Sequence, residues 1–246
     1  MDYDYIKKGD CLKLMDDIPD KSIDMILCDL PYGITNNLWD IVIPFNELWR
    51  QYNRIIKDHG CIALFSDGLF MVDLIQANRK YFKYNLIWDC NQPKDFLNAN
   101  RKPLKTHEYI SIFYKNPPTY NPQFTSGTPY HKKSPKKASS NYREFNPTPT
   151  INDDGKRYPH TVINFIKPVG NKYHPTQKPL NLLEWLINTY TNKGDIVLDN
   201  CMGSGSTCVA CITTDRHYIG FELNDEYFEI ARKRIEREQS QLKLDI

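Results

Sequence analysis

The fold of this chain is decided by the stretch Ile196-Val197-Leu198-Asp199-Asn200-Cys201-Met202-Gly203-Ser204-Gly205-Ser206-Thr207. Its pattern is a short apolar strand that ends in an acidic residue, followed by a Gly-x-Gly turn and the start of a helix. Two glycines let the backbone approach a ligand closely, and the free N–H groups of a helix N-terminus attract an anion such as a carboxylate. The stretch therefore predicts a ligand-binding loop between a buried strand and a helix.

A second acidic residue follows the next predicted strand, Tyr218-Ile219-Gly220-Phe221. Glu222 ends that strand, where a carboxylate can accept hydrogen bonds from both hydroxyls of a ribose. The pair of strand ends thus predicts a cofactor that contains a nucleoside. The third glycine of a dinucleotide fingerprint is replaced by Cys208, and the chain has no Gly-x-x-x-x-Gly-Lys-Ser/Thr motif, so NAD and P-loop chemistry are disfavoured.

Strand-like and helix-like segments alternate through most of the chain. Segments of strand length are 23–28, 61–65, 84–88, 109–113, 196–198 and 218–221, and segments with helical spacing are 43–57, 70–75, 180–190 and 225–238. This alternation is typical of an α/β sheet with buried central strands. Asn224 is a suitable N-cap for the last helix.

One basic segment breaks this alternation. Residues 115–172 hold ten Lys or Arg against three Asp or Glu, while the rest of the chain holds 22 against 27, which together give the net charge of +2. Nine of the 16 prolines fall in the same segment, so we expect irregular structure with few strands there. The charge indicates a polyanion, with nucleic acid as the first candidate and a merely solvated loop as the alternative. We therefore predict one α/β domain, 1–114 and 173–246, interrupted by an insert at 115–172.

Composition narrows the class of protein further. The 246 residues are 40% hydrophobic and 25% charged, which describes a globular chain long enough for a substantial core. The sequence has neither a membrane-length apolar run nor a signal-peptide layout, and its seven cysteines are scattered, so we expect an intracellular protein with free thiols. Cys208 and Cys211 have the spacing of a metal-binding pair, but no second such pair accompanies them, and no metal is expected.

A second loop of chemical interest, Asp29-Leu30-Pro31-Tyr32-Gly33, follows the strand at 23–28. Loops at the carboxyl ends of parallel strands are where α/β sheets bind ligands. This loop offers a carboxylate, carbonyls beside the rigid Pro31, and an aromatic ring. These groups suit a planar base with an exocyclic amino group, because Asp29 and a carbonyl accept its N–H bonds while Tyr32 stacks on the ring. A turn with a packing tyrosine is the structural alternative.

Taken together, these motifs resemble the amino-group DNA methyltransferases that use S-adenosylmethionine, over essentially the whole chain. Asp29-Leu30-Pro31-Tyr32 matches the family's Asp-Pro-Pro-Tyr tetrapeptide, and 199–207 matches its cofactor loop. Further matches are His174-Pro175-Thr176-Gln177-Lys178-Pro179, Gly9-Asp10-Cys11, Trp39-Asp40 and His107-Glu108-Tyr109. The motif order is similar to that of the beta class, whose target-recognition region lies in the middle of the chain.

The resemblance implies a Rossmann-like, mixed but mostly parallel sheet with helices on both faces, the class I methyltransferase fold. The basic insert would be the target-recognition and DNA-binding region. Two positions depart from the family pattern. Leu30 replaces the second-position proline, and Asn200-Cys201 stands where the family typically has Pro-Phe. Because that phenylalanine usually packs beside the cofactor, we expect a different affinity or pocket shape.

The implied reaction is site-specific methyl transfer from S-adenosylmethionine to the N6 amino group of a flipped-out adenine. Asp29 and the Leu30 or Pro31 carbonyl would orient that amino group, and Tyr32 would stack on the base, so that Asp29, Pro31 and Tyr32 form the catalytic set. Cytosine-C5 methylation needs a cysteine nucleophile, which generally lies in a Pro-Cys dipeptide. The chain contains no Pro-Cys dipeptide, so this reaction is excluded.

The resemblance also implies a set of cofactor residues. Glu222 would bind the ribose, Asp10 the adenine amino group, and Lys178 with Thr176 the methionine carboxylate. The full predicted set is Asp10, Cys11, Asp29, Thr176, Lys178, Asp199, Cys201, Gly203, Gly205, Ser206, Thr207 and Glu222. In the insert, phosphate contacts are expected from Lys132, Lys133, Lys136 and Lys137.

Two alternatives remain at this point. The first is cytosine-N4 methylation by the same fold, although such enzymes usually open the tetrapeptide with Ser instead of Asp. The second is a catalytically silent relative that binds DNA or RNA. The expected partner is double-stranded DNA and not a membrane, and the resemblance leaves room for a homodimer and a cognate restriction endonuclease. We expect a prokaryotic or phage-encoded protein of the cytoplasm.

Overall fold

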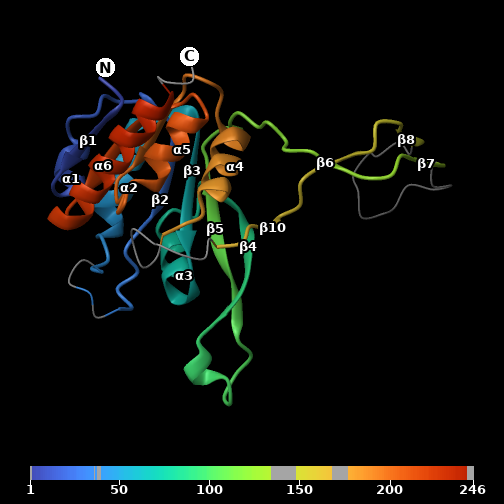
Figure 1. The fold of residues 1–246 in the computed structure, drawn as a ribbon, viewed down its shortest axis with the longest axis horizontal. Helices are drawn as coiled ribbons and strands as arrows, with labels where there is room; N and C mark the ends of the chain where they lie inside the picture. The colour runs from blue at the N-terminus through green and yellow to red at the C-terminus, as the bar shows by residue number, and fades with distance from the viewer. Residues whose placement is uncertain (1, 36, 38–39, 134–147, 168–176, 243–246) are drawn as a thin grey trace. The chain divides into compact units, whose positions relative to one another are not determined.

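The computed structural model describes residues 2–35, 37, 40–133, 148–167 and 177–242 (Figure 1). The chain forms two compact units. The larger unit contains Met1–Asn121 and Thr161–Ile246, and the smaller contains Pro122–His160. The sequence analysis placed the insert at 115–172. The smaller unit is shorter than this insert, because residues 115–121 and the part of the segment from Thr161 onward belong to the larger unit.

An eight-stranded sheet forms the centre of the larger unit. Its strands lie in the order β1 (Tyr5–Lys8), β12 (His217–Glu222), β11 (Ile196–Asp199), β2 (Ile23–Asp29), β3 (Ile56–Ser66), β5 (Lys105–Phe113), β4 (Phe82–Lys94) and β10 (Val162–Asn164). Only β5 pairs antiparallel with its neighbours, β3 and β4, and all other pairings in this sheet are parallel. The carboxyl ends of the seven codirectional strands therefore lie at one edge.

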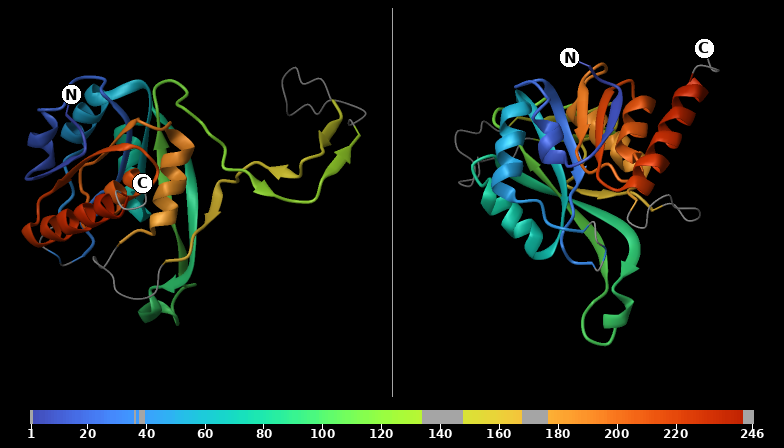
Figure 2. Two further views of the ribbon diagram at one scale, coloured as in Figure 1. Left: turned by 45° about the horizontal axis from the view of Figure 1, so that its top comes forward. Right: turned by 90° about the vertical axis from the view of Figure 1, so that its left-hand side faces the viewer.

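Helices cover both faces of this sheet. They are α1 (Cys11–Met15), α2 (Phe45–Ile55), α3 (Gly68–Ala77), α4 (Leu180–Tyr190), α5 (Ser206–Thr213) and α6 (Asp225–Leu242). The right-hand view of Figure 2 shows α2 and α3 on one side of the strands and α4 and α6 on the other. The predicted helices at 180–190 and 225–238 are both present, and Asn224 caps α6 by accepting the Tyr227 N–H at 3.1 Å.

Strand β2 shows how the sequence produces two hydrophobic cores. Successive side chains of a strand point to opposite faces of the sheet. Met25 and Leu27 accordingly pack with residues of α4, α5 and α6, whereas Ile26 and Cys28 pack with residues of α1, α2 and α3. A strand buried on both faces reads as a continuous apolar run, which is why 23–28 shows no polar alternation.

Four described elements of the large unit were not predicted from sequence: β1, α1, η1 (Phe96–Asn98) and β10. Each is five residues or shorter, and none leads into a Gly-x-Gly turn of the kind that marked the equally short strand at 196–198. β10 lies in the segment assigned to the insert, yet it pairs with β4, and Trp88 Nε1 donates to the Phe165 carbonyl at 2.7 Å.

The smaller unit contains two short antiparallel ladders in its described residues. They pair β6 (Thr125–Ser126) with β9 (Lys156–Arg157) and β7 (Tyr130–Lys132) with β8 (Thr150–Asn152). Strands of two or three residues agree with the expectation of mostly irregular structure in a proline-rich segment. In the part of the chain that the structure describes, no helix is long and apolar enough to span a membrane.

Arg216 forms hydrogen bonds both to the end of α4 and to the turn before β12, so its replacement tests how much these bonds stabilise the fold. The guanidinium is 8% exposed and donates to Thr191 Oγ1, the Thr191 carbonyl, Asn188 Oδ1 and the Thr214 carbonyl. Arg216→Met removes the donor from two buried acceptors on Thr191 and two half-buried ones on Asn188 and Thr214, so we expect the free energy of unfolding to fall by about 2–4 kcal/mol. Urea denaturation measures it. Arg232→Met, which removes an exposed arginine of α6, should leave the urea midpoint nearly unchanged. Equal loss in both variants would contradict this role for Arg216.

Candidate functional site

Acidic residues gather at the carboxyl edge of the large sheet. Asp29, Asp199 and Glu222 are the last residues of β2, β11 and β12, and Asp10 follows β1 after Gly9. These four strands are parallel neighbours, so their ends lie together, as labelled in Figure 1. The edge is where α/β sheets place their ligands.

The carboxylate of Asp29 is held by two donors. The Tyr32 hydroxyl donates to Oδ1 at 3.0 Å, and Lys178 Nζ donates to Oδ2 at 2.5 Å. Each oxygen retains capacity for a further hydrogen bond. The Asp29 side chain is 26% exposed, so an incoming group can reach it.

Glu108 extends this contact into a buried charge cluster. Its carboxylate lies 3.2 Å from Lys178 Nζ and 3.2 Å from Lys167 Nζ, and it also pairs with Lys94. Burial alone would raise the pKa of Glu108, but the three ammonium groups outweigh it and hold the pKa far below its ordinary value. For Lys178, burial opposes the charge, but Asp29 and Glu108 outweigh it and raise its pKa. The cluster therefore keeps Lys178 charged and fixed beside Asp29.

The loop after Asp29 is shaped by Asp40. This carboxylate accepts the N–H groups of Gly33, Ile34 and Thr35 at 2.8, 3.0 and 2.7 Å. Burial acts to raise the pKa of Asp40, but these hydrogen bonds outweigh it and lower the pKa. Three bonds to one carboxylate hold the backbone that carries Tyr32.

A pair of stacked aromatic rings and a cavity lie next to this loop. The Tyr32 ring stacks on Phe70 of α3 with 4.6 Å between centroids and 25° between planes. The cavity has a volume of about 370 Å³ and is lined by Tyr32, Ile34, Val42, Phe45, Asp67, Gly68, Leu69, Phe70 and Asp73. Its volume lies within the range of small-molecule sites, roughly 300–1,000 Å³.

The Gly-x-Gly loop folds as its sequence predicted. Asp199 is 4% exposed and accepts the Cys201 N–H at 3.1 Å, and burial raises the pKa of its carboxyl to about 6. Gly205 directly precedes α5 with φ of +76°, and a Cβ there would lie 3.0 Å from the Cβ of Ala231. The left-handed backbone and the close approach of α6 both require glycine at this position.

Glu222 lies across from this loop. One carboxylate oxygen accepts the Gly203 N–H at 2.8 Å and the other accepts the Asn224 N–H at 2.7 Å. Burial raises the pKa of Glu222 despite these two bonds. Each oxygen keeps a lone pair for another donor, which is the arrangement that two vicinal hydroxyls require.

The unusual Asn200-Cys201 pair has its own partners in the core. Asn200 is 2% exposed, and its Oδ1 accepts the Tyr52 hydroxyl of α2 at 2.5 Å. Cys201 Sγ accepts Asn200 Nδ2 at 3.5 Å and packs in the same cluster as Cys11 and Cys28, where burial raises the pKa of Cys28 to about 12. Two polar residues are thus accommodated where the family usually has Pro-Phe.

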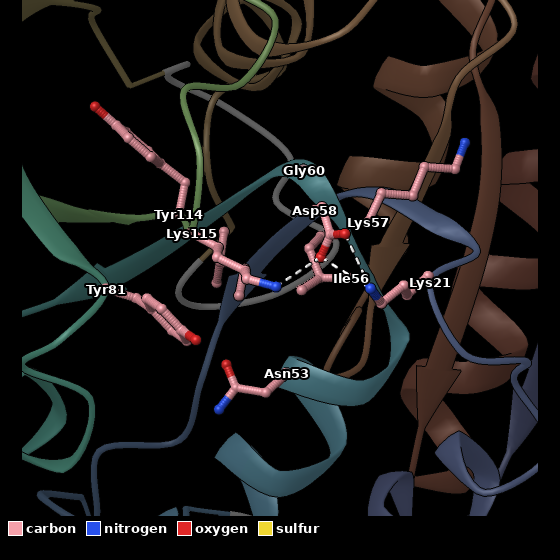
Figure 3. A pocket seen from close by; sticks show the side chains of 10 residues that line it. Lys21, Asn53, Ile56, Lys57, Asp58, Gly60, Tyr81, Tyr114 and Lys115 are labelled. Carbon is pink, nitrogen blue, oxygen red and sulfur yellow. Dashed lines mark hydrogen bonds and ion pairs between the residues drawn. The ribbon is translucent and has the colours of Figure 1, made fainter.

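A second cavity, of about 80 Å³, lies at the opposite edge of the sheet (Figure 3). Lys21 and Lys115 both pair there with Asp58, at 2.9 and 3.0 Å. Tyr81 and Tyr114 also line it. Because its charged groups are already paired and its volume holds only a few water molecules, we assign it no part in the site.

The structure describes most residues predicted for the site. Those at the carboxyl edge are Asp10, Cys11, Asp29, Pro31, Tyr32, Lys178, Asp199, Cys201, Gly203, Gly205, Ser206, Thr207 and Glu222. Lys132 ends β7 and Lys133 follows it, both exposed in the smaller unit. Thr176, Lys136 and Lys137 lie outside the described residues. The ligand roles of all these side chains remain predictions. Within the described residues, no group of three or more His, Cys, Asp or Glu could hold a metal ion.

Sequence reasoning assigned no role to Glu108 or Asp40, although both stood in recognised motifs. A charged residue at the start of an apolar strand was the available signal for Glu108, but its three lysine partners come from distant segments. The structure also places Lys178 against Asp29, a contact that the sequence did not suggest.

Comparisons with known proteins identify the proteins that this chain is similar to. A family model described as DNA methylase matches residues 23–233. The chain is 28% identical to the type II methyltransferase M2.MboI of Moraxella bovis, over 93% of this chain and 86% of that protein. It is 27% identical to the DNA adenine methyltransferase YhdJ of Escherichia coli strain K12, over 93% and 81%.

Solved structures confirm the predicted class I methyltransferase fold. The structure of the M1.HpyAVI–SAM complex matches with a TM-score of 0.65 and 26% identity, covering 94% of this chain and 98% of that one. The cytosine-N4-specific PvuII DNA methyltransferase matches with a TM-score of 0.67 at 16% identity, covering 95% and 86%. The second likeness shows the fold alone and does not choose between target bases.

Glu222 provides a test of the cofactor side. Glu222→Gln replaces one charged acceptor by an N–H₂ donor, so we expect the affinity for S-adenosylmethionine to fall by about 10- to 100-fold. Isothermal titration calorimetry measures the Kd, and Glu226→Gln, in the first turn of α6, is the matched control. Unchanged affinity in Glu222→Gln would contradict ribose binding by this residue.

Asp199 makes stability depend on pH. A carboxyl whose native pKa is raised binds its proton more tightly in the folded state, so stability is greatest below the ordinary pKa and falls as pH rises toward 6. Between about pH 5 and about pH 7.5, wild type should lose about 1–2 kcal/mol more unfolding free energy than Asp199→Asn. Urea denaturation at both pH values measures this difference. Parallel pH dependence in the two proteins would refute it.

Proposed function

Since the chain belongs to the DNA methylase family, whose model spans residues 23–233, we propose that it is a site-specific DNA adenine-N6 methyltransferase that uses S-adenosylmethionine. The observation that carries this proposal is that two carboxylates with different surroundings lie at the same edge of the sheet. Asp29 is oriented by Lys178, and Glu222 accepts a backbone N–H while keeping lone pairs that could accept ribose hydroxyls. The name of the relative YhdJ, an adenine methyltransferase, supports adenine as the base.

The residues at this edge fit the cofactor. Glu222 keeps a lone pair on each oxygen for the two ribose hydroxyls, and the start of α5 offers unpaired N–H groups for a carboxylate. When bound, S-adenosylmethionine supplies an electrophilic methyl group on a sulfonium. Lys178 already pairs with Asp29 and Glu108, so we assign it primarily to the catalytic carboxylate.

The chain's part in catalysis is orientation. The lone pair of an adenine amino group is delocalised into the ring, which makes the nitrogen a poor nucleophile. Asp29 and the Leu30 or Pro31 carbonyl accept its two N–H bonds, which localises electron density on nitrogen and aims it at the methyl group. Because Tyr32 and Lys178 hold the two Asp29 oxygens, the carboxylate meets the amino group in one orientation.

The target base must leave the duplex to reach Asp29, since its amino edge is paired inside DNA. Phe70 covers one face of the Tyr32 ring, and we assign the flipped adenine to the other face. Of the two carboxylates that pair with Lys178, Asp29 is the more exposed, at 26% against 10% for Glu108. This difference favours Asp29 as the group that contacts the base.

The smaller unit is the proposed target-recognition region. Lys132 and Lys133 are exposed there, and Lys132 Nζ lies 5.0 Å from the ring centroid of Tyr130. Exposed lysines contact phosphates and position a duplex without reading its sequence. We extend the proposal to a cytoplasmic location in a bacterium or phage-infected cell, and to a homodimer or a cognate endonuclease as further partners.

The proposed reaction is tested by methyl transfer from labelled S-adenosylmethionine to unmethylated duplex DNA, followed by nucleoside analysis. We expect N6-methyladenine from the wild type, and a loss of at least about 100-fold in Asp29→Ala, since positioned polar groups typically contribute that much. Asp58→Ala, at the opposite edge of the sheet, is the matched control and should retain activity (Figure 3).

Other products would change the assignment in defined ways. N4-methylcytosine would overturn the choice of base but keep the cofactor and the catalytic carboxylate. Cofactor binding without any methylated nucleoside from DNA would overturn the proposed activity and favour a silent DNA-binding relative or an RNA substrate.

A further inference from the structure

The hairpin between β4 and β5 exposes apolar side chains at its tip. Residues 95–104 extend beyond the sheet at the edge where Asp29 lies, with the short helix η1 (Phe96–Asn98) at the end (Figures 1 and 2). Phe96 is 78% exposed and Leu97 is 82% exposed. Two large adjacent apolar side chains at the end of a projecting polar hairpin indicate a surface that meets a partner.

The tip is held in a defined conformation. Asp95 has a left-handed backbone, with φ of 63°, and its Oδ2 accepts Lys102 Nζ at 2.7 Å. The Asn98 carbonyl accepts the N–H groups of Arg101 and Lys102 at 2.8 and 3.0 Å. A tip that is ordered before binding loses little conformational entropy when it inserts into a partner.

Ion pairs connect both strands of the hairpin to the site. At the end of β4, Lys94 pairs with Glu108, which contacts Lys178 and through it Asp29. At the start of β5, Lys105 pairs with Asp67, which lines the cavity beside Tyr32. The hairpin is therefore fixed on the side from which a base must approach Asp29.

Charge identifies the partner as nucleic acid. Residues 91–105 contain Lys94, Arg101, Lys102 and Lys105 against one acidic residue, Asp95. Lys94 and Lys105 pair with Glu108 and Asp67 at the base of the hairpin, whereas Arg101 and Lys102 are exposed at its tip, where Asp95 is the acidic neighbour. In a two-fold contact between copies, the same patch would face itself and its charges would repel. A duplex offers regularly spaced phosphates to the basic residues and base steps to the apolar tip.

We propose that the β4–β5 hairpin is a second DNA-binding element, whose Phe96-Leu97 tip inserts between bases next to the target while Arg101 and Lys102 contact phosphates. This inference rests on the proposed function. A flipped base leaves a gap and weakened stacking in the duplex, and an apolar wedge at that gap stabilises the opened state.

The apolar tip is tested by changing Phe96→Ser and Leu97→Ser together. Both side chains are exposed, so the fold should persist, as circular dichroism and the urea midpoint will verify. Fluorescence anisotropy with a fluorescein-labelled duplex fragment of the assayed DNA should show about tenfold weaker binding. Tyr3→Ser, an exposed aromatic residue preceding β1, is the matched control and should bind like wild type.

The basic residues are tested by the salt dependence of the same binding. Arg101→Gln with Lys102→Gln should lower the slope of log K against log salt by about 0.9 for each lost phosphate contact. Lys193→Gln is the matched control for Lys102, because both lysines form exposed ion pairs of 2.7 Å with an aspartate.

The outcomes separate this inference from the proposed function. Methylation by wild type together with unchanged duplex affinity in the tip variant would overturn the hairpin proposal alone. Weaker duplex binding by the tip variant, in a chain that forms no methyladenine, would support the hairpin and overturn the proposed activity alone. Sedimentation velocity supplies a third readout. If the tip variant loses a dimer while each chain still binds DNA as wild type does, the tip belongs to a contact between copies and the proposal fails.

Discussion

The structure depends on one constraint: parallel strands that end in acidic residues bring their carboxylates to the same edge. Burying several like charges together costs free energy through desolvation and mutual repulsion. Each carboxyl at this edge is stabilised differently. Burial raises the pKa of Asp199 to about 6, and its carboxylate accepts the Cys201 N–H, while Glu222 accepts two backbone N–H groups. Asp29 instead pairs with Lys178, which remains charged because it also contacts Glu108.

These different environments suit the different tasks that the proposed function assigns to these residues. A carboxylate that must accept an amino group needs to be exposed and firmly oriented, and Asp29 has both properties. A carboxylate that recognises two hydroxyls needs lone pairs on both oxygens within a dry site, which describes Glu222. Glu108 is buried beneath three lysines, so it acts on its neighbours and not on a substrate. Side chains that share the carboxyl group thus differ in exposure and protonation because of their burial and partners.

Compensation explains how the chain tolerates its departures from the family pattern. Asn200 would be costly in a buried position without a partner. Tyr52 supplies a hydroxyl for it from α2, on the face where Ile26 and Cys28 also pack. Cys201 fits among two further thiols. Gly205 precedes α5 in the left-handed conformation that the Gly-x-Gly turn requires.

The sequence by itself determined the elements whose signals are local. Periodicity, glycine conformation and strand ends depend on neighbouring residues, so they could be identified in the sequence. They gave the apolar runs at 23–28 and 196–198, the helix at 180–190, the Gly-x-Gly turn and the acidic residues at the strand ends. The class of fold and the two motif loops, 29–33 and 199–207, followed from them. Elements such as β1 and β10 did not, because, unlike the equally short run at 196–198, neither leads into a Gly-x-Gly turn, and each is recognised only by the neighbouring strand with which it pairs. Only the tertiary structure decided that Lys178 lies on Asp29, that Lys94 and Lys167 meet at Glu108, and that Asp40 holds the loop of Tyr32. The ion pairs join residues that are distant along the chain, and Asp40 acts through the orientation of its carboxylate toward backbone N–H groups. Charges interact through space, so the spacing of residues along the sequence does not reveal these contacts.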